Sequence, residues 1–307
     1  MLEELRARGL LSAGEPVVVL VSGGRDSVCL LDLAVRLVGA GAVRALHVNY
    51  GLRAAAPEDE ALCARLGERL GVALEVVRAE RPEGGNLQAW AREVRYAAAR
   101  RLADALGEAS IATGHTASDQ AETVLYRLAS SPGRRALLGM RERDGRLVRP
   151  LLGYTRARVT AYCEERGLAW CEDETNASQL YARGRVRHGL LPALAAVHPA
   201  AEANVVRTAE LLRDEAEVLD ELVAEALAGA DRIELSRLRA LAPALRRLVV
   251  QRLADAAANG LAPRAARRTE EILALPARPV AALDVGDGVR AVVEGGALCF
   301  VATPGSK

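Results

Sequence analysis

The amino-acid sequence predicts an α/β fold: a parallel five-stranded sheet with helices on both faces, plus a smaller, mainly helical C-terminal domain that ends in short strands. Two observations lead to this prediction. Short apolar, β-branched runs alternate with helical patterns through the first 150 or so residues, which is typical of a parallel sheet covered on both faces. After Pro192 this alternation stops and helical patterns dominate.

The first part of the chain contains five segments that we expect to form the strands of the sheet. They are residues 17–21, 43–48, 72–78, 109–113 and the extended piece 147–152. Helices are expected between them, at residues 26–38, 57–70, 86–106 and 117–129, and another opens at Thr155. Ligands of such sheets bind beyond the carboxyl ends of the strands.

The second part begins with a long helical pattern over residues 201–228, rich in Ala, Leu and Glu. More helix follows to about residue 275, and the tail 280–302 alternates strand-like runs with turn residues, which suggests a small hairpin. We therefore place a domain boundary near residue 200, giving domains 1–200 and 201–307.

Composition narrows the function classes. The N-terminus is expected to form a short amphipathic helix without an apolar signal core. No apolar run approaches the roughly 20 residues of a membrane helix, so no membrane partner is expected. Five scattered cysteines without a CxxC pair indicate reduced, structural thiols in a cytoplasmic protein.

Arginines are concentrated in two stretches of a chain whose net charge is only +1. Eight arginines face two acids between residues 134 and 158, and nine face three between 231 and 268. A local surplus of this kind is what a phosphate-binding face shows. Because the only lysine is Lys307, arginine also fills ordinary surface positions, and that alternative stays open.

A glycine-rich turn, 22-SGGRDS-27, joins the first strand to the first helix. Its glycines allow close approach of a ligand to the backbone, and the helix N-terminus favours an anion. The turn matches neither GxxxxGKS/T nor GxGxxG. Asp26 would repel a bound phosphate unless Mg²⁺ lies between them. The alternative is a plain strand-to-helix turn with a capping Ser or Asp.

This turn resembles the PP-loop of the N-type ATP pyrophosphatases, which cleave ATP between the α and β phosphates. The resemblance implies a sheet with strand order 3-2-1-4-5 and ATP as co-substrate. It also implies which residues bind the nucleotide: Ser22, Gly23, Gly24, Arg25, Asp26 and Ser27.

Further segments are similar to the tRNA(Ile)-lysidine synthetase family. They are 46-LHVNYGLR-53, 88-QAWAREVRY-96, 113-TGHTASDQAETVLYRL-128, 148-VRPLL-152, 172-EDETNAS-178 and 181-YARGRVRHGLLPAL-194. The similarity covers about residues 15–200, and the chain departs from the family pattern at Tyr50, Ser118 and Gly184.

The resemblance implies an ATP-dependent ligase acting on the isoleucine tRNA with anticodon CAU. ATP would adenylate the C2 oxygen of the wobble cytidine, and free L-lysine would then displace AMP, leaving lysidine. The domain 1–200 would be catalytic, and 201–307 would be a helical linker and tRNA-binding domain. A homodimer is left open.

His115, Asp119 and Glu122 are spaced four and three apart, which predicts that they share one helix face. We expect this face to be free for a ligand. By resemblance, Asp119 and Glu122 bind lysine and ease its deprotonation, Asp119 joins Asp26 at Mg²⁺, and His115 positions phosphate or substrate.

Arg95 and Arg187 complete the implied catalytic set of Asp26, Arg95, His115, Asp119, Glu122 and Arg187. Arg95 would stabilise charge developing on the α-phosphate. Arg187 alternates with Arg183 and Arg185, which in an extended segment would point to one side, and it is expected to contact phosphate or tRNA. His47 follows the second strand, where adenosine is expected, but a structural role fits it equally well.

Three alternatives differ from this function. A PP-loop tRNA enzyme that adds sulfur generally needs paired cysteines, which this sequence lacks. A GMP-synthetase-like amidation would need an ammonia source. A non-catalytic nucleotide- or tRNA-binding protein would not need Asp26, Arg95, Asp119 and Glu122 together.

Overall fold

The computed structural model describes residues 1–52, 56–131, 133–171 and 182–303. Residue contacts divide the chain into two compact units, residues 1–212 and 213–307, and each is described by itself. The division falls inside the long helix α10 (Ala201–Leu227). The predicted functional boundary near residue 200 remains a prediction.

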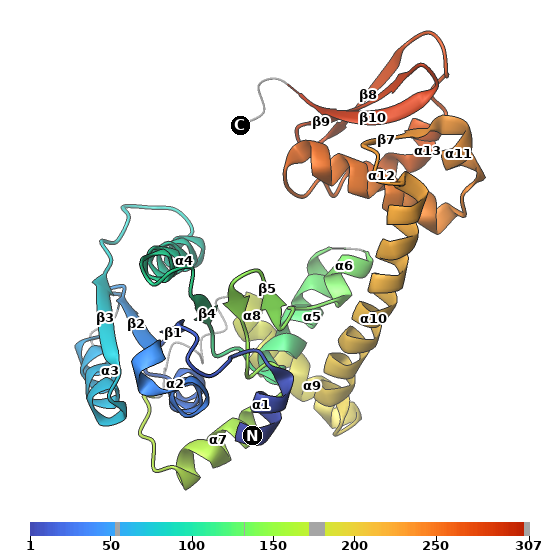
Figure 1. Ribbon diagram of the computed structural model, residues 1–307. Helices are drawn as coiled ribbons and strands as arrows, with labels where there is room; N and C mark the ends of the chain where they lie inside the picture. Colours follow the sequence, from blue (N-terminus) through green and yellow to red (C-terminus); the bar gives the residue numbers. More distant parts are fainter. Residues whose placement is uncertain (53–55, 132, 172–181, 304–307) are drawn as a thin grey trace. The chain divides into compact units, whose positions relative to one another are not determined.

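The first unit is built on a six-stranded sheet with the order β3-β2-β1-β4-β6-β5 (Figure 1). Its strands are β1 (Val17–Leu20), β2 (Val43–Asn49), β3 (Ala73–Arg78), β4 (Ser110–Ala112), β5 (Arg143–Asp144) and β6 (Leu147–Val148). All neighbours are parallel except β5, which runs antiparallel to β6 at one edge. The predicted α/β fold and the order 3-2-1-4-5 are confirmed, with β6 as the fifth strand and the two-residue β5 as an addition.

Helices cover both faces of this sheet (Figure 1). The main ones are α2 (Arg25–Val38), α3 (Ala56–Leu70), α4 (Leu87–Ala105), α5 (Ala117–Ser130) and α7 (Arg156–Glu165). The shorter ones are α1 (Leu2–Arg8), η1 (Ala40–Ala42), α6 (Arg134–Leu137), α8 (Ala182–Arg185), the π-helical turn η3 (Val186–Leu190) and α9 (Leu191–Val197).

The alternation of side chains along β1 explains the two layers. Val17 and Val19 pack with α1, α2, α3 and α7 in one core cluster. Val18 and Leu20 point to the other face and pack with the small residues of α4 in a second cluster. Because both faces are buried, β1 is apolar throughout, and its carboxyl end opens directly into the glycine turn.

Local capping explains where the site-bearing helices begin. The Asn86 side chain accepts hydrogen bonds from the Gln88 and Ala89 N–H groups at the start of α4. Thr116 caps α5, and Thr155 caps α7 by accepting from the Arg158 N–H. These side chains satisfy donors that a helix N-terminus leaves without intrahelical partners.

The second unit packs helices against a four-stranded antiparallel sheet with the order β7-β10-β9-β8. Its strands are β7 (Arg232–Glu234), β8 (Ala281–Gly286), β9 (Val289–Glu294) and β10 (Ala297–Ala302), and its helices are α11 (Leu235–Ala240), α12 (Pro243–Ala258), η4 (Ala265–Arg268) and α13 (Thr269–Leu273). The predicted hairpin is part of a larger sheet. The prediction missed β7 because three residues with one buried side chain, Ile233, give too short a signal.

In the part of the chain that the structure describes, no helix combines the length and the apolar character needed to cross a bilayer.

Candidate active site

The glycine turn after β1 is held in shape by two serine side chains. Ser27 Oγ accepts from the Ser22 N–H at 3.1 Å and donates to the Gly24 carbonyl at 2.7 Å. Gly23 has φ +87°, a conformation that side chains other than glycine rarely adopt. The backbone of this turn is therefore held in one conformation.

This turn is suited to an anion. Gly24 precedes α2, and among the described residues the N–H groups of Arg25 and Asp26 have no hydrogen-bond acceptor at the positive end of the helix dipole. Ser22 is exposed beside them. The predicted nucleotide-binding residues 22–27 are thus brought together at one end of α2, as phosphate binding requires.

Asp26 lies in this first turn. Its Oδ1 accepts from Arg25 Nε at 3.1 Å, and Oδ2 has no hydrogen-bond partner among the described residues. Burial raises the pKa of Asp26 above its usual value, and the negative charge of Asp119 adds to the rise against the opposing effect of Arg25. The charges of Asp26 and Asp119 therefore act on each other, while their shared metal site remains a prediction.

The loop between β4 and α5 packs directly on the glycine turn. A Cβ at Gly114 would meet the Asp26 carbonyl oxygen at 2.9 Å, its carbonyl carbon at 3.0 Å and the Ser27 nitrogen at 3.1 Å. These are backbone atoms, which cannot move aside alone. Only glycine allows this contact, and it joins the ends of β1 and β4.

The two carboxylates of α5 form a network with arginines from three elements. Glu122, which has no exposed surface, accepts from Arg187 Nε at 2.5 Å and from Arg183 Nε at 3.2 Å. Asp119 Oδ1 accepts from Arg187 Nη2 at 3.3 Å. Arg156 Nη2, from α7, lies 3.7 Å from Glu122 Oε1.

Two expectations about this region were wrong. The helix face that carries Asp119 and Glu122 is covered by arginines rather than free, because a buried carboxylate needs compensation. Residues 183–187 are helical rather than extended, in α8 and the following π-helical turn, so the approach of Arg183 and Arg187 to α5 follows helical geometry.

Asp119 also shapes the start of its own helix. Its Oδ2 accepts from the Thr116 N–H and from Thr116 Oγ1, both at 2.9 Å, and the Thr116 hydroxyl accepts in turn from the Asp119 N–H. Burial alone would raise the pKa of Asp119, but Arg183, His115 and the Thr116 hydrogen bonds together hold it below its usual value. The carboxylate is therefore ionised and fixed in orientation.

His115 precedes α5, and its Nδ1 lies 2.8 Å from Thr113 Oγ1. Burial lowers the pKa of His115 to about 4, with further lowering from the charges of Arg183, Arg149 and Arg95 against the opposite effect of Asp119. The imidazole is therefore neutral at neutral pH. A base this weak suits hydrogen bonding to phosphate or substrate better than proton abstraction.

Arg187 has the reverse shift. Burial alone would lower its pKa, but the hydrogen bond to Glu122 and the charges of Glu122, Asp119 and Asp26 raise it above the usual value. Arg187 is therefore linked electrostatically to all three carboxylates of the predicted site.

Arg95 projects from α4, and its charge acts on His115. Its Nε is buried with no hydrogen-bond partner among the described residues, and its guanidinium carbon lies 5.9 Å from the centre of the Tyr96 ring. A buried donor without an acceptor is costly, so this guanidinium has the capacity to bind an anion that the described residues do not supply.

His47 is buried at the end of β2, with Nδ1 2.9 Å from the Val21 carbonyl oxygen and 3.4 Å from Cys63 Sγ. These contacts hold the end of β1 and fit the structural role. Tyr50, a departure from the family pattern, stacks edge-on against Trp90 at 5.7 Å and donates to the Ala91 carbonyl. It therefore anchors α4, which carries Arg95.

The donor set fits Mg²⁺. Among the described residues no three His, Cys, Asp or Glu side chains form a metal cluster. Mg²⁺ in nucleotide sites usually takes one or two carboxylates and completes its shell with phosphate oxygens and water. Asp26, with an unpartnered Oδ2 next to the anion-binding turn, is such a ligand, and Asp119 is the second carboxylate nearby.

Sequence reasoning did not assign three residues that build the site: Gly114, Thr116 and Arg156. Thr116 could have been found, because 116-TASD-119 has the spacing of a capping box. Gly114 and Arg156 act through contacts between distant segments, which spacing does not reveal.

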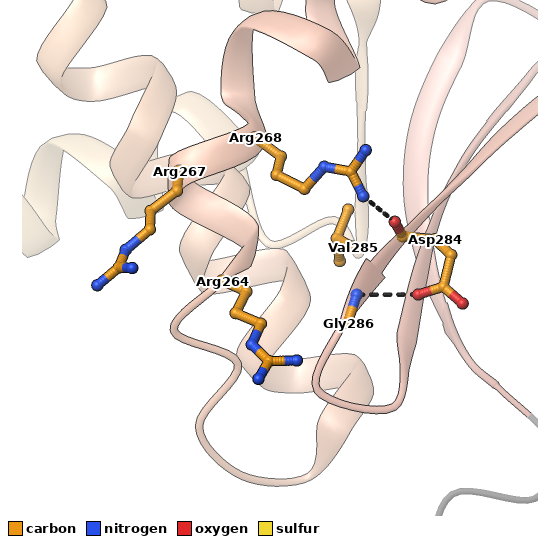
Figure 2. A pocket seen from close by; sticks show the side chains of 6 residues that line it. All are labelled: Arg264, Arg267, Arg268, Asp284, Val285 and Gly286. Atoms are coloured by element: carbon orange, nitrogen blue, oxygen red, sulfur yellow. Dashed lines mark hydrogen bonds between the residues drawn. The ribbon is translucent and has the colours of Figure 1, made fainter.

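The second unit contains a pocket of about 510 Å³ lined by Arg264, Arg267, Arg268, Asp284, Val285 and Gly286 (Figure 2). Arg268 donates to the Asp284 carbonyl and pairs with Glu271, and Arg264 lies 3.7 Å from the Asp287 carboxylate. Arg267 points away from the other two arginines. Three arginines and one aspartate thus line this hollow, and two of the arginines pair with carboxylates.

The chain belongs to the PP-loop domain family, whose model matches residues 3–194. Its curated relatives include two tRNA(Ile)-lysidine synthases. That of Thermus thermophilus is 44% identical over 215 residues, covering 68% of this chain and 42% of the relative. That of Dehalococcoides mccartyi is 34% identical over 302 residues, covering 90% of this chain and 64% of the relative. The chain thus spans about two fifths to two thirds of the length of these relatives.

Among solved structures, the U34-tRNA thiolase NcsA from Methanococcus maripaludis, with its 4Fe-4S cluster, aligns with a TM-score of 0.57. The alignment covers 69% of this chain and 77% of the thiolase at 20% identity. This likeness supports the fold and does not favour thiolation.

We predict that Gly114→Ala destabilises the protein by about 1–3 kcal/mol and weakens ATP binding, because its Cβ would push the β4–α5 loop away from the glycine turn. Thermal unfolding and nucleotide titration measure the two effects. Gly41→Ala is the control, since nothing lies within 4 Å of a Cβ there. Equal behaviour of the two variants would show that the close contact is unimportant.

We predict that His115 titrates near pH 4. Since its pKa is lower in the folded than in the unfolded state, its contribution to stability is complete above about pH 6.5 and is lost as the pH falls toward 4. NMR of the imidazole resonances, assigned by comparison with His115→Gln, measures the midpoint. A midpoint near 6.5 would contradict the buried, neutral state.

Proposed function

We propose that this chain ligates L-lysine to C2 of the wobble cytidine in the isoleucine tRNA with anticodon CAU. The observation that carries the proposal is the contact of Gly114 with Asp26. It sets an anion-binding turn beside a helix with two ionisable carboxylates, in a chain whose curated relatives are tRNA(Ile)-lysidine synthases. Work on tRNA would place the protein in the cytoplasm.

In the first step, the turn at residues 22–27 binds the ATP phosphates through backbone N–H groups and the Ser22 and Ser27 hydroxyls. Asp26 and Asp119 would hold Mg²⁺ against the phosphate oxygens, and the ion would neutralise part of their charge. The C2 oxygen of cytidine attacks the α-phosphorus, and pyrophosphate leaves.

Arg95 and His115 act on the group that gains charge in this step. The unpartnered guanidinium of Arg95 stabilises negative charge on the α-phosphate. Neutral His115 donates a hydrogen bond without adding a charge that would draw the phosphate from the glycine turn. His115 follows β4, and the charge of Arg95 acts on it.

In the second step, Asp119 and Glu122 bind the ammonium groups of lysine. In the structure Arg183 and Arg187 balance these carboxylates. Both arginines are also anion-binding groups, so nucleotide phosphates compete for them and leave the carboxylates to the lysine cation. The amino group of lysine attacks C2 after it has lost a proton, and AMP leaves with the oxygen that was bound to C2.

The second unit contributes to tRNA binding in this proposal, in keeping with the predicted tRNA-binding domain 201–307. The arginine-lined pocket of Figure 2 supports this role, because guanidinium groups bind phosphate oxygens in bidentate fashion. Arg264 and Arg267 are the exposed arginines of this pocket.

The decisive experiment incubates the protein with an isoleucine tRNA transcript, ATP and labelled lysine, followed by nucleoside mass spectrometry. Lysidine that depends on all three components is expected. Its absence, with ATP and tRNA both bound, would reduce the protein to a binding protein.

We predict that Arg95→Ala slows tRNA-dependent pyrophosphate release by about a hundredfold, because one donor to the transition-state charge is lost. The control is Arg100→Ala, an exposed arginine on the same helix. Release at the wild-type rate in Arg95→Ala would refute this role.

We predict that Asp119→Asn and Glu122→Gln raise the KM for lysine about tenfold and impair lysine use more than ATP binding, because a charged partner of the ammonium groups is lost. Steady-state kinetics with varied lysine and a separate ATP titration test this. The control is Glu164→Gln, exposed on α7. Unchanged lysine kinetics in both variants would show that lysine does not bind to this helix face.

A further inference from the structure

A group of arginines near Arg95 has no carboxylate partner. Arg92 lies on α4, Arg127 on α5 and Arg149 directly after β6. None of the three forms an ion pair within the part of the chain that the structure describes. This differs from Arg183 and Arg187, whose charge is balanced by Asp119 and Glu122.

Arg149 is the buried member, with only 6% of its surface exposed. Its Nη1 donates to the Arg141 carbonyl at 2.6 Å, which fixes the guanidinium plane. Its Nε is buried without a partner, and Nη2 makes no hydrogen bond to the described residues. The Nε–Nη2 edge, the fork that binds an oxyanion in bidentate fashion, is therefore unused.

Arg127 is anchored in the same way and close by. Its Nη1 donates to the Gly139 carbonyl at 2.8 Å, two residues before the carbonyl that holds Arg149. Arg92 lies against Tyr96, its guanidinium carbon 4.7 Å from the ring centre. Three cations thus gather around the loop 139–141 and the Tyr96 ring.

The electrostatics agree with this geometry. Burial lowers the pKa of Arg149, Tyr96 and Asp144 oppose this effect, and the charges of Arg92 and Arg127 add a smaller lowering. Burial likewise lowers the pKa of Arg127, and the charges of Arg92 and Arg183 lower it further. Guanidinium groups remain protonated nonetheless, so the like charges repel and a bound anion would relieve that repulsion.

We infer that Arg149, flanked by Arg92 and Arg127, binds one phosphodiester group of the RNA strand that carries the target base. An RNA phosphate fits better than a phosphate of ATP, because the charges with the largest effect on Asp26 at the glycine turn are those of Arg25, Asp119 and Arg156, and none of these three arginines is among them. The charges of Arg149 and Arg95 both act on His115. Arg149 would therefore position the RNA strand beside the α-phosphate site.

This inference rests on the proposed function for the identity of the RNA. Its test measures RNA binding in the absence of ATP and lysine, with the full chain and an isoleucine tRNA transcript. Arg149→Gln is expected to weaken binding about tenfold. It should also reduce the slope of log Kd against log salt concentration by about 0.7–0.9, the loss of one phosphate contact.

Arg149→Lys is the diagnostic variant, because it keeps the charge and loses the fork. It should restore most of the salt slope but only part of the affinity. If Arg149→Gln fails to fold, Arg92→Gln and Arg127→Gln test the same site from its more exposed side, each with a smaller loss. Arg100→Gln on α4 is the matched control and should bind RNA like the wild type.

Three outcomes would overturn the inference: RNA affinity and salt slope equal to the control in all three glutamine variants, loss of ATP binding in parallel with RNA binding, or no RNA binding by the wild-type chain. An unrelated tRNA should lose affinity equally in Arg149→Gln, since a phosphate contact carries no sequence information. Lysidine formation is assayed separately, so failure of the proposed reaction with intact Arg149-dependent RNA binding leaves this site standing.

Discussion

The buried carboxylate of Glu122 is the group on which the site depends. An ionised carboxylate without solvent contact is stable only when cations and hydrogen bonds surround it. Arg187 and Arg183 supply these from the segment before α9, and Arg156 lies near from the start of α7. One acidic side chain on α5 therefore fixes where α7, α8 and η3 meet. This meeting point lies beside the strand ends that carry the glycine turn.

In the proposed reaction, the same network would combine opposite requirements. A nucleotide site must attract polyphosphate, and a site for a cationic substrate must present carboxylates. The arginines that cover Asp119 and Glu122 would keep these carboxylates from repelling phosphate, and the carboxylates hold the arginines close. Each partner would become available only when a ligand of the opposite charge takes its place, which would favour binding of both substrates together over either one alone.

The helices and the glycine turn could be predicted because they follow from local periodicity and turn chemistry, whereas the strand order was implied by the family resemblance. Val17 to Leu20 is apolar since both of its faces are covered, and that is visible in four residues. Contacts between distant segments were not predictable in this way. Arg183 to Arg187 were expected to be extended, which was wrong because ion pairing with α5 favours a helix. Strand β7 was missed because it pairs with β10, a strand about 60 residues further along the chain. The departure at Ser118 has a contact of the same kind, its hydroxyl donating to Glu202 at 2.6 Å from the first turn of α10.

Charge counting illustrates why sequence alone cannot locate an anion site in this chain. The net charge of +1 and the arginine-rich stretches do not distinguish Arg156 from Arg149, since both residues lie between positions 134 and 158. Arg156 lies near a buried carboxylate, so part of its charge is balanced within the protein. Arg149 is buried near other arginines with an unused donor edge, and none of the described carboxylates forms an ion pair with it. The difference depends on which side chains the fold brings to each guanidinium. An uncompensated buried cation is costly for folding, and its retention beside the strand ends is best explained by an anionic ligand that returns that cost on binding.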